Sequence, residues 1–126
     1  MNTYNRAHAL AQALKESLQL KKYQEAKAKL DEDPSAKEML TDFRKAQLEL
    51  QKQQMSGVEI SEEQKERVSK LYEVINLNLV VKEYLEAENQ LLVMVQDIYK
   101  IIGEPLSDVL GPELSPFEET GESENK

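Results

Sequence analysis

The stretch that decides the fold is LNLVVKEYLEAENQLLVMVQDIYKII, residues 77–102. One line of residues on it follows an alternating spacing of four and three and is apolar or aromatic at seven of its eight positions: Leu77, Val81, Tyr84, Leu91, Val95, Ile98 and Ile102. A second line, one helical turn-width from the first, recurs at every seventh residue and consists of Leu85, Leu92 and Tyr99. Both spacings match an α-helix, so we predict a helix roughly 39 Å long whose wide apolar face must be covered by other helices.

The exception on the first line is Glu88, which stands between Tyr84 and Leu91. The sequence leaves two interpretations open. Either the carboxylate lies at the edge of the apolar face and reaches water, or it is partly buried and pairs with a donor from the helix predicted at 34–55. Burying an unpaired carboxylate is costly, so the second interpretation requires a partner, for which Gln47 and Arg44 are the candidates.

The first half of the chain also reads as helical. Residues 4–19 and 20–32 carry apolar stripes whose phase changes near Leu18 to Leu20, which predicts a bend or short break there. Pro34 then favours the start of a long helix over 34–55. Its N-cap is either Asp33 or a capping box formed by Ser35 and Glu38, and the sequence does not decide between them.

The second half carries clear start and stop signals. Gly57 is a natural left-handed residue after the 34–55 helix, and Ser61 with Gln64 opens the next helix as a capping box. Asn76 and Asn78 favour a break before the apolar stretch over one continuous helix from 62 to 102. The sequence GEP at 103–105 predicts that the apolar helix stops there, with 106–110 as one further turn that folds back on the body.

These signals predict an all-α protein. We expect an antiparallel helical bundle of four or five helices, two of them long, that is oligomeric. The helical domain covers residues 1–111. Residues 112–126 are rich in acids and poor in apolar side chains, and we expect them to form a disordered tail.

Composition narrows the classes of function. The 126 residues carry a net charge of −8, and the seven acids against one lysine in residues 104–126 account for most of it. Basic residues elsewhere are interleaved with acids, which argues against a nucleic-acid surface. There is no cysteine, no apolar run approaching the ~20 residues of a membrane span and no signal-peptide pattern at the start. We therefore expect a cytoplasmic protein without a membrane or nucleic-acid partner.

No catalytic arrangement emerges from the sequence. It has no glycine-rich phosphate loop, no nucleophile motif and no cluster of metal ligands. The single histidine, His8, has no second histidine or cysteine to join it, so we interpret it as an ordinary surface residue. We accordingly expect no enzymatic activity, cofactor, metal or small-molecule substrate.

The sequence resembles the YlbF/YmcA family of small bacterial helical proteins, and within it the YheA-like branch. The resemblance covers roughly residues 4–111. It is carried by Asp33-Pro34-x-Ala36-Lys37, Phe43-Arg44-x-x-Gln47-x-x-x-Gln51-x-x-Gln54, Met55-x-Gly57, Ile60 and Tyr84-x-x-Ala87-Glu88-x-x-Leu91. It implies an all-helical fold, self-association, a cytoplasmic location and a Bacillus-like source.

The resemblance also implies a kind of function. YlbF and YmcA act without enzymatic activity, in a complex with a third protein that influences RNA processing, competence, sporulation and biofilm formation. Iron–sulfur clusters in that complex are ligated by cysteine, and this chain has none to contribute.

We therefore expect a non-enzymatic helical module for protein–protein interaction, with a regulatory adaptor like YlbF/YmcA as its specific form and a homo-oligomer as its state. A holdase-like chaperone that binds non-native chains is the alternative. The residues expected at an oligomer interface or polar seam are Phe43, Arg44, Gln47, Tyr84, Glu88, Leu91, Val95 and Ile98.

Overall fold

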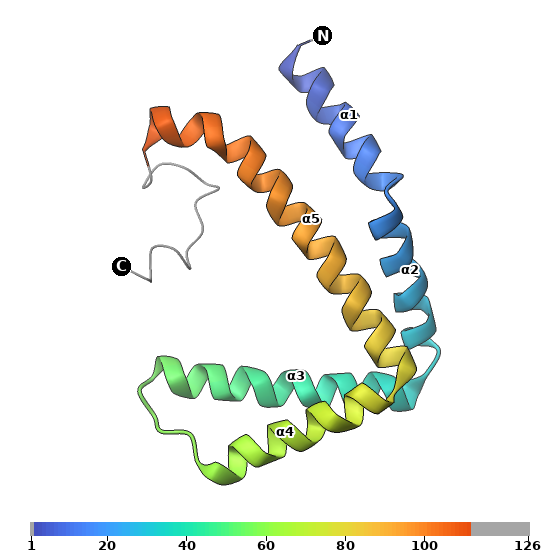
Figure 1. The fold of residues 1–126 in the computed structure, drawn as a ribbon, viewed down its shortest axis with the longest axis vertical. Coiled ribbons are helices and arrows are strands. Elements are labelled where there is room, and N and C mark those ends of the chain that lie inside the picture. Colours follow the sequence, from blue (N-terminus) through green and yellow to red (C-terminus); the bar gives the residue numbers. More distant parts are fainter. Residues whose placement is uncertain (1, 112–126) are drawn as a thin grey trace. The chain divides into compact units, whose positions relative to one another are not determined.

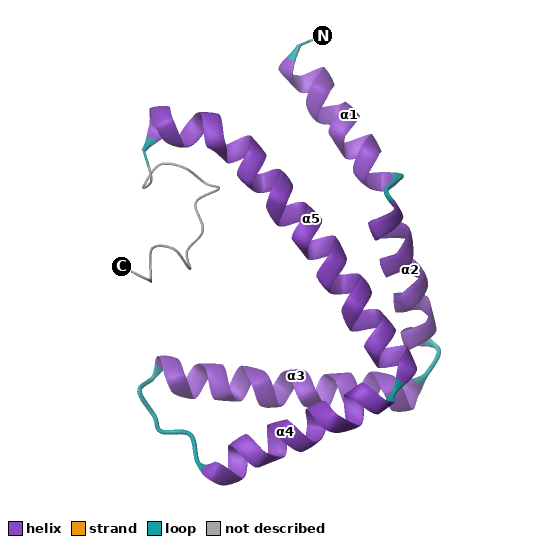
Figure 2. Ribbon diagram, viewed as in Figure 1, coloured by secondary structure: helices purple, strands orange, loops and turns teal. Residues whose placement is uncertain are grey.

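The computed structural model describes residues 2–111, and this part of the chain consists of helices and their connections, without a strand (Figure 2). The two longest helices are the third and the fifth, so the predicted all-α fold with two long helices is confirmed. The five helices are α1 (Thr3–Lys15), α2 (Leu18–Asp31), α3 (Pro34–Met55), α4 (Glu62–Leu77) and α5 (Leu79–Leu110) (Figure 1).

The chain divides into two compact units, Met1–Glu88 and Asn89–Lys126. The first unit holds α1 to α4 and the first ten residues of α5. The second unit begins with the remainder of α5, which we call the distal segment, residues 89–110. The acidic tail predicted at 112–126 lies outside the described residues.

Side-chain caps explain why α1 and α2 are separate helices. The Ser17 hydroxyl accepts a hydrogen bond from the backbone N–H of Leu20 at 3.2 Å and donates one to the carbonyl of Leu14 at 2.8 Å. Ser17 thus closes one helix and opens the next, which satisfies donors that a helix start otherwise leaves unpaired. A break is present as predicted, but it lies at residues 16–17, just before the stretch 18–20 where it was expected, and its cause is a serine cap.

The start of α3 decides the question that the sequence left open. The Asp33 carboxylate accepts a hydrogen bond from the N–H of Ala36 at 3.1 Å, so Asp33 is the N-cap. Pro34 occupies the first turn, where its missing N–H costs nothing. Asp31, at the end of α2, also pairs with Lys37 of α3 at 3.3 Å, which adds a charged contact at this corner.

Helices α3 and α4 form a hairpin and lie side by side (Figure 1). Gly57 follows α3 with a φ of 78°, a conformation that favours glycine. Ser61 and Gln64 then form the predicted capping box. The Gln64 amide also donates to the side chain of Gln53 at 2.6 Å, which ties the start of α4 to the end of α3.

A single residue, Asn78, separates α4 from α5. Its backbone is extended, with φ −98° and ψ 110°, and its side chain accepts a hydrogen bond from the N–H of Val81 at 3.1 Å. The break expected at this point is therefore confirmed, and the asparagine serves as the cap of α5.

The predicted stop at 103–105 is wrong, because α5 runs through Pro105 to Leu110. A proline within a helix removes one backbone hydrogen bond, here the one to the carbonyl of Ile101, and the apolar spacing continues beyond it. The ribbon bends in these last turns, as expected at a proline (Figure 1). The helix ends instead at Gly111, which has a φ of 81° and donates to the carbonyl of Ser107 at 3.1 Å.

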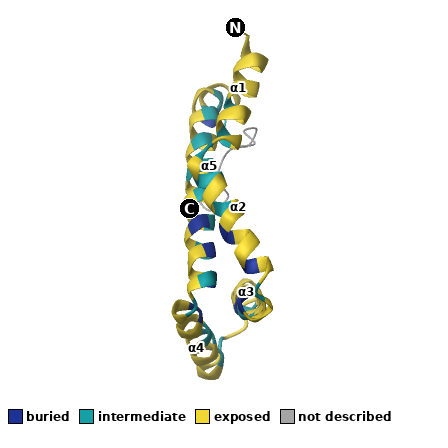
Figure 3. Ribbon diagram, turned by 90° about the vertical axis from the view of Figure 1, so that its right-hand side faces the viewer, coloured by how far each residue is buried: buried dark blue, intermediate teal, exposed yellow. Residues whose placement is uncertain are grey.

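The hydrophobic core of the first unit forms where α2, α3, the end of α4 and the first turns of α5 meet (Figure 3). Ile75 and Val81 are almost fully buried, and each such side chain contributes about 1.5–3 kcal/mol. α1 contributes no buried residue. The core residues are Ala26, Leu30, Ala36, Leu40, Phe43, Ile75, Val81, Tyr84 and Ala87.

Candidate functional site

The first turns of α5 are held in the core of the first unit, and this fixes where Glu88 lies. Val81, Tyr84 and Ala87 are buried there, and Glu88 follows one position later at the end of the unit. The apolar spacing places Glu88 on the same side of α5 as Tyr84, one turn further along.

Glu88 is partly buried, with 25% of its side chain exposed, and it is paired. Arg44 of α3 donates from Nη2 to Oε1 of Glu88 at 2.7 Å. The Tyr84 hydroxyl donates to the other carboxylate oxygen, Oε2, at 3.3 Å. Of the two candidate partners for this acid, the structure brings Arg44 to it, whereas Gln47 is exposed on α3.

Two tyrosines extend this polar cluster to α2. The hydroxyls of Tyr23 and Tyr84 are 3.1 Å apart, and because Tyr84 donates to Glu88, Tyr23 is the donor of this second bond. Their ring centroids are 5.5 Å apart and tilted by 41°, a favourable arrangement of aromatic rings. The Arg44 guanidinium also lies 5.8 Å from the centroid of the Tyr84 ring, within cation–π distance.

The cluster shifts the proton affinities of its members in directions that follow from its geometry. Burial raises the pKa of Tyr84 above its ordinary value, and the hydrogen bond with Tyr23 raises it further. The hydrogen bond with Glu88 raises the pKa of Arg44. Tyr84 thus keeps its proton and Arg44 its positive charge. This suits a cluster that holds α3 against α5 rather than one that transfers a proton.

The remaining predicted site residue of α3, Phe43, is buried in the core. Its ring lies 5.9 Å from that of Tyr72 of α4, with the two planes tilted by 36°. Phe43 therefore packs α3 against α4 within the first unit.

Leu91, Val95 and Ile98 belong to the distal segment and lie on one line of α5, where each is partly exposed. Because α5 passes Pro105, the line continues beyond Ile102 to positions that sequence reasoning did not include. Leu106 lies four residues after Ile102 and Val109 three residues after Leu106, and Val109 is 81% exposed. The strict alternation of four and three places its next position at Pro105 instead, so the spacing pointed to Val109 but not to Leu106.

Tyr23 is the other residue missing from the predicted site. Its contact with Tyr84 joins positions 61 residues apart in the chain. Helical spacing within one segment carries no information on such a pairing, so nothing in the sequence pattern pointed to it.

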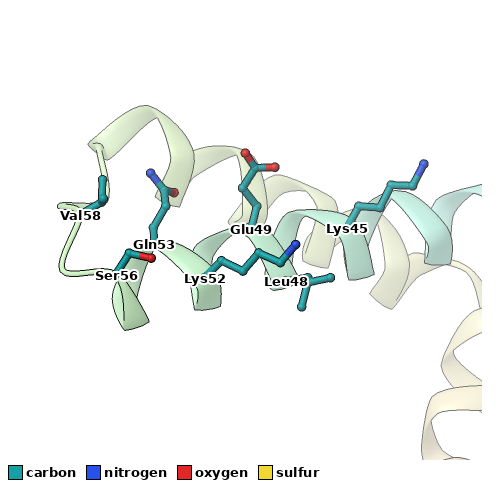
Figure 4. A pocket seen from close by; sticks show the side chains of 7 residues that line it. All are labelled: Lys45, Leu48, Glu49, Lys52, Gln53, Ser56 and Val58. Atoms are coloured by element: carbon teal, nitrogen blue, oxygen red, sulfur yellow. The ribbon is translucent and has the colours of Figure 1, made fainter.

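A surface hollow of about 470 Å³ lies along the C-terminal half of α3 (Figure 4). Its side chains alternate in charge, with Glu49 between Lys45 and Lys52, and include the exposed apolar Leu48 and Val58. No histidine or cysteine lines it. Among the side chains that line this hollow, no nucleophile is paired with a general base.

Residues 2–111 contain no group of three or more histidine, cysteine, aspartate or glutamate side chains arranged to hold a metal ion. Within the same range, none of the helices combines the length and the apolar character required to cross a membrane.

Comparison with known proteins adds relatives and a family. A UPF0342 protein from Symbiobacterium thermophilum is 46% identical over 101 residues, which cover 80% of this chain and 90% of the relative. A UPF0342 protein from Shouchella clausii is 39% identical over 110 residues, covering 87% of this chain and 93% of the relative. Such identities over nearly the whole of both chains indicate common descent.

A solved structure has the same fold. It is a protein of unknown function (DUF964) from Bacillus stearothermophilus, with a TM-score of 0.70 and 24% sequence identity over 84% of this chain and 93% of that chain. The family model described as "Control of competence regulator ComK, YlbF/YmcA" matches residues 3–107, almost all of the helical part. The chain therefore belongs to the YlbF/YmcA family.

Proposed function

We propose that this protein is a non-enzymatic module for protein–protein interaction that self-associates through the apolar face of the distal segment and serves as a regulatory adaptor. The observation that carries this proposal is a line of α5 without charge. From Leu91 to Val109 every position on it is apolar: Leu91, Val95, Ile98, Ile102, Leu106 and Val109.

Exposure supports an interaction at this face. On this line Val109 is 81% exposed and the other five residues are half-buried, and Leu92 beside the line is 49% exposed. Single amphipathic helices gain most of their stability from packing of the apolar face rather than from intrinsic propensity. A face of this kind on a well-formed helix needs a cover, and exposed apolar surfaces of this type mark sites of protein interaction.

The absence of catalytic geometry in residues 2–111 supports a non-enzymatic role. The polar cluster around Glu88 is a closed set of satisfied hydrogen bonds, and no described side-chain nitrogen or oxygen is buried without a partner. The relatives named above carry no enzyme name. The family description refers to control of a competence regulator, which supports a regulatory adaptor as the specific form.

Sedimentation equilibrium at micromolar concentration tests self-association. We expect a mass of at least twice 14.5 kDa for the unaltered chain. Val95→Glu places a charge on the apolar line and should lower that mass, because the carboxylate would be desolvated in the assembly. Val93→Glu is the matched control, since Val93 lies on the opposite side of α5 and should leave the mass unchanged. A 14.5 kDa monomer would overturn the proposal.

Affinity capture tests the adaptor role. The tagged full chain is used as bait in a cytosolic extract of the source organism, with the Val95→Glu chain as the control bait. We expect one stoichiometric partner that the control does not retain. A broad set of non-native proteins would instead indicate a holdase-like chaperone.

A further inference from the structure

We infer that Met39 is a modification site, at which oxidation of the thioether to a sulfoxide by hydrogen peroxide strengthens the contact between α3 and the junction of α4 with α5. The residues that carry this inference all lie in the first unit, Met1–Glu88. It does not depend on the proposed self-association.

The Asn78 side chain makes two contacts at the junction, one from each end of its amide. Oδ1 accepts a hydrogen bond from the backbone N–H of Val81 at 3.1 Å and so caps α5. Nδ2 donates to Sδ of Met39, on α3, at 3.6 Å. Asn78 is half-buried and is the one residue between the two helices. Because the sulfur holds the nitrogen, the oxygen is the end of the amide that faces α5.

The contact with the sulfur is the weaker of the two, because a thioether is a weak hydrogen-bond acceptor. Met39 lies at the edge of the core, next to the buried Leu40 and one turn from the buried Ala36 and Phe43. Its own side chain is half-buried. A partly exposed methionine is open to an oxidant as small as hydrogen peroxide.

The reaction transfers one oxygen atom to the sulfur. The thioether attacks one oxygen of hydrogen peroxide, and the S–O bond forms as the O–O bond breaks. The hydroxide that leaves takes the proton from the transferred oxygen and becomes water. The sulfur is oxidised by two electrons and the peroxide is reduced by two. A methionine sulfoxide reductase reverses the change, with a pair of thiols as the reductant and a disulfide and water as the other products.

Oxidation replaces a weak acceptor with a strong one. The sulfoxide oxygen is polar and lies one bond beyond the sulfur, at the end of a flexible side chain. A sulfoxide at the edge of a core is destabilising when its oxygen has no partner. At Met39 the Asn78 amide is a donor already in place, so we expect the oxygen to be satisfied and the contact with α3 to become stronger.

The other methionines of residues 2–111 provide internal references. Met55 is 82% exposed and Met94 is half-buried. Among the described residues, Met39 is the methionine whose sulfur accepts a hydrogen bond. Oxidation of Met55 or Met94 therefore creates an oxygen without an Asn78 amide to meet it.

Amide exchange of Val81 before and after treatment with hydrogen peroxide gives the first test, with the oxidised positions identified by mass spectrometry. We expect Met39 to be oxidised while the chain stays folded. The exchange of the Val81 N–H should then slow by roughly fivefold, the effect of one additional hydrogen bond that holds its cap in place. The Met39→Leu chain keeps the other methionines, so peroxide should leave its Val81 exchange unchanged.

Asn78→Asp gives the second test, because it changes one end of the amide only. The aspartate keeps an oxygen that can accept from the N–H of Val81, but it replaces the Nδ2 donor with a second oxygen. That oxygen repels a sulfoxide instead of binding it. In this variant we expect peroxide to speed the exchange of Val81, the opposite of its effect on the unaltered chain.

Three results would overturn the inference. The first is unchanged or faster exchange of Val81 in the oxidised unaltered chain. The second is a Met39 that reacts only when the chain unfolds. The third is a change of the same direction in the unaltered and Asn78→Asp chains, because the amide would then not be the partner of the sulfoxide.

Discussion

At the scale of single residues, the contact between Arg44 and Glu88 ties α3 to the first turns of α5. Replacing Arg44 by alanine removes the ion pair and the packing on the Tyr84 ring and leaves a partly buried carboxylate with one donor fewer. Since the arginine side chain is 46% exposed, water screens the pair, and we expect a loss of about 1–2 kcal/mol in the free energy of unfolding. Urea denaturation measures it.

The control for this experiment is Gln47→Ala, a change at an exposed position one turn further along α3, which should cost under about 0.5 kcal/mol. Glu88→Leu should be milder than Arg44→Ala, because it extends the apolar line and removes the acid that needs a partner. The double substitution should show a coupling of at least about 0.5 kcal/mol. Additive effects would show that the two side chains do not stabilise each other.

Tyr84 gives a prediction for alkaline pH. Its pKa is higher in the folded chain than in the unfolded chain, where tyrosine has a pKa of ~10. Its stabilising contribution is therefore complete below pH ~10 and is lost as the pH rises through the folded-state pKa, because the unfolded chain releases the proton first. We expect the free energy of unfolding of the unaltered chain to fall more steeply above pH ~10 than that of Tyr84→Phe. Equal slopes would contradict the shift.

At the scale of the helices, Asn78 is a cap that starts α5 at a defined residue. Asn78→Ala removes the hydrogen bond to the N–H of Val81 and should cost about 1 kcal/mol, the usual value for an N-cap. Asn76→Ala is the matched control, since Asn76 is exposed within the last turn of α4, where alanine is at least as good a helix former. Thermal unfolding of the two variants compares them, and equal melting temperatures would rule out a capping role.

Pro105 interrupts the hydrogen bonds of α5 without ending the helix. Pro105→Ala restores the N–H that the carbonyl of Ile101 lacks, so we expect slower amide exchange in the last turns of α5 and a higher melting temperature. Pro34→Ala should bring no comparable gain, because a proline in the first helical turn replaces an N–H that has no helical acceptor. Unchanged exchange in Pro105→Ala would show that the bend has another cause.

The helices also show where sequence reasoning succeeds. Asp33, Gly57 and the capping box at Ser61 act through backbone groups within a few residues, so local sequence predicted these boundaries. The stop predicted at Pro105 was wrong. It rested on the one backbone hydrogen bond that proline removes, whereas the apolar pattern of α5 extends along the whole helix and past the proline. The pairing of Tyr23 with Tyr84 depends on how α2 and α5 approach each other, which no spacing within a single helix encodes.

At the scale of the whole molecule, the two parts of α5 differ in what surrounds them. Val81, Tyr84 and Ala87 are buried in the core of the first unit, whereas the apolar line of the distal segment is half-buried from Leu91 to Leu106 and exposed at Val109. Amide exchange should therefore be slow and independent of protein concentration near Val81. Near Val95 it should slow as the concentration rises, because assembly stabilises the segment. Concentration-independent exchange near Val95 would contradict assembly at this face.

The continuity of α5 has a mechanical consequence. Because the helix crosses from one unit into the other without a break, its clamped end acts as a fulcrum and the distal segment as a lever arm. With an arm of roughly 33 Å, a tilt of about 10° at Glu88 would move the far end sideways by about 6 Å, more than half of the roughly 8–10 Å that separates the axes of packed helices. A displacement of this size would lift the apolar line off any helix packed on it, so that a small rearrangement around Arg44 and Tyr84 would be converted into the gain or loss of a binding surface.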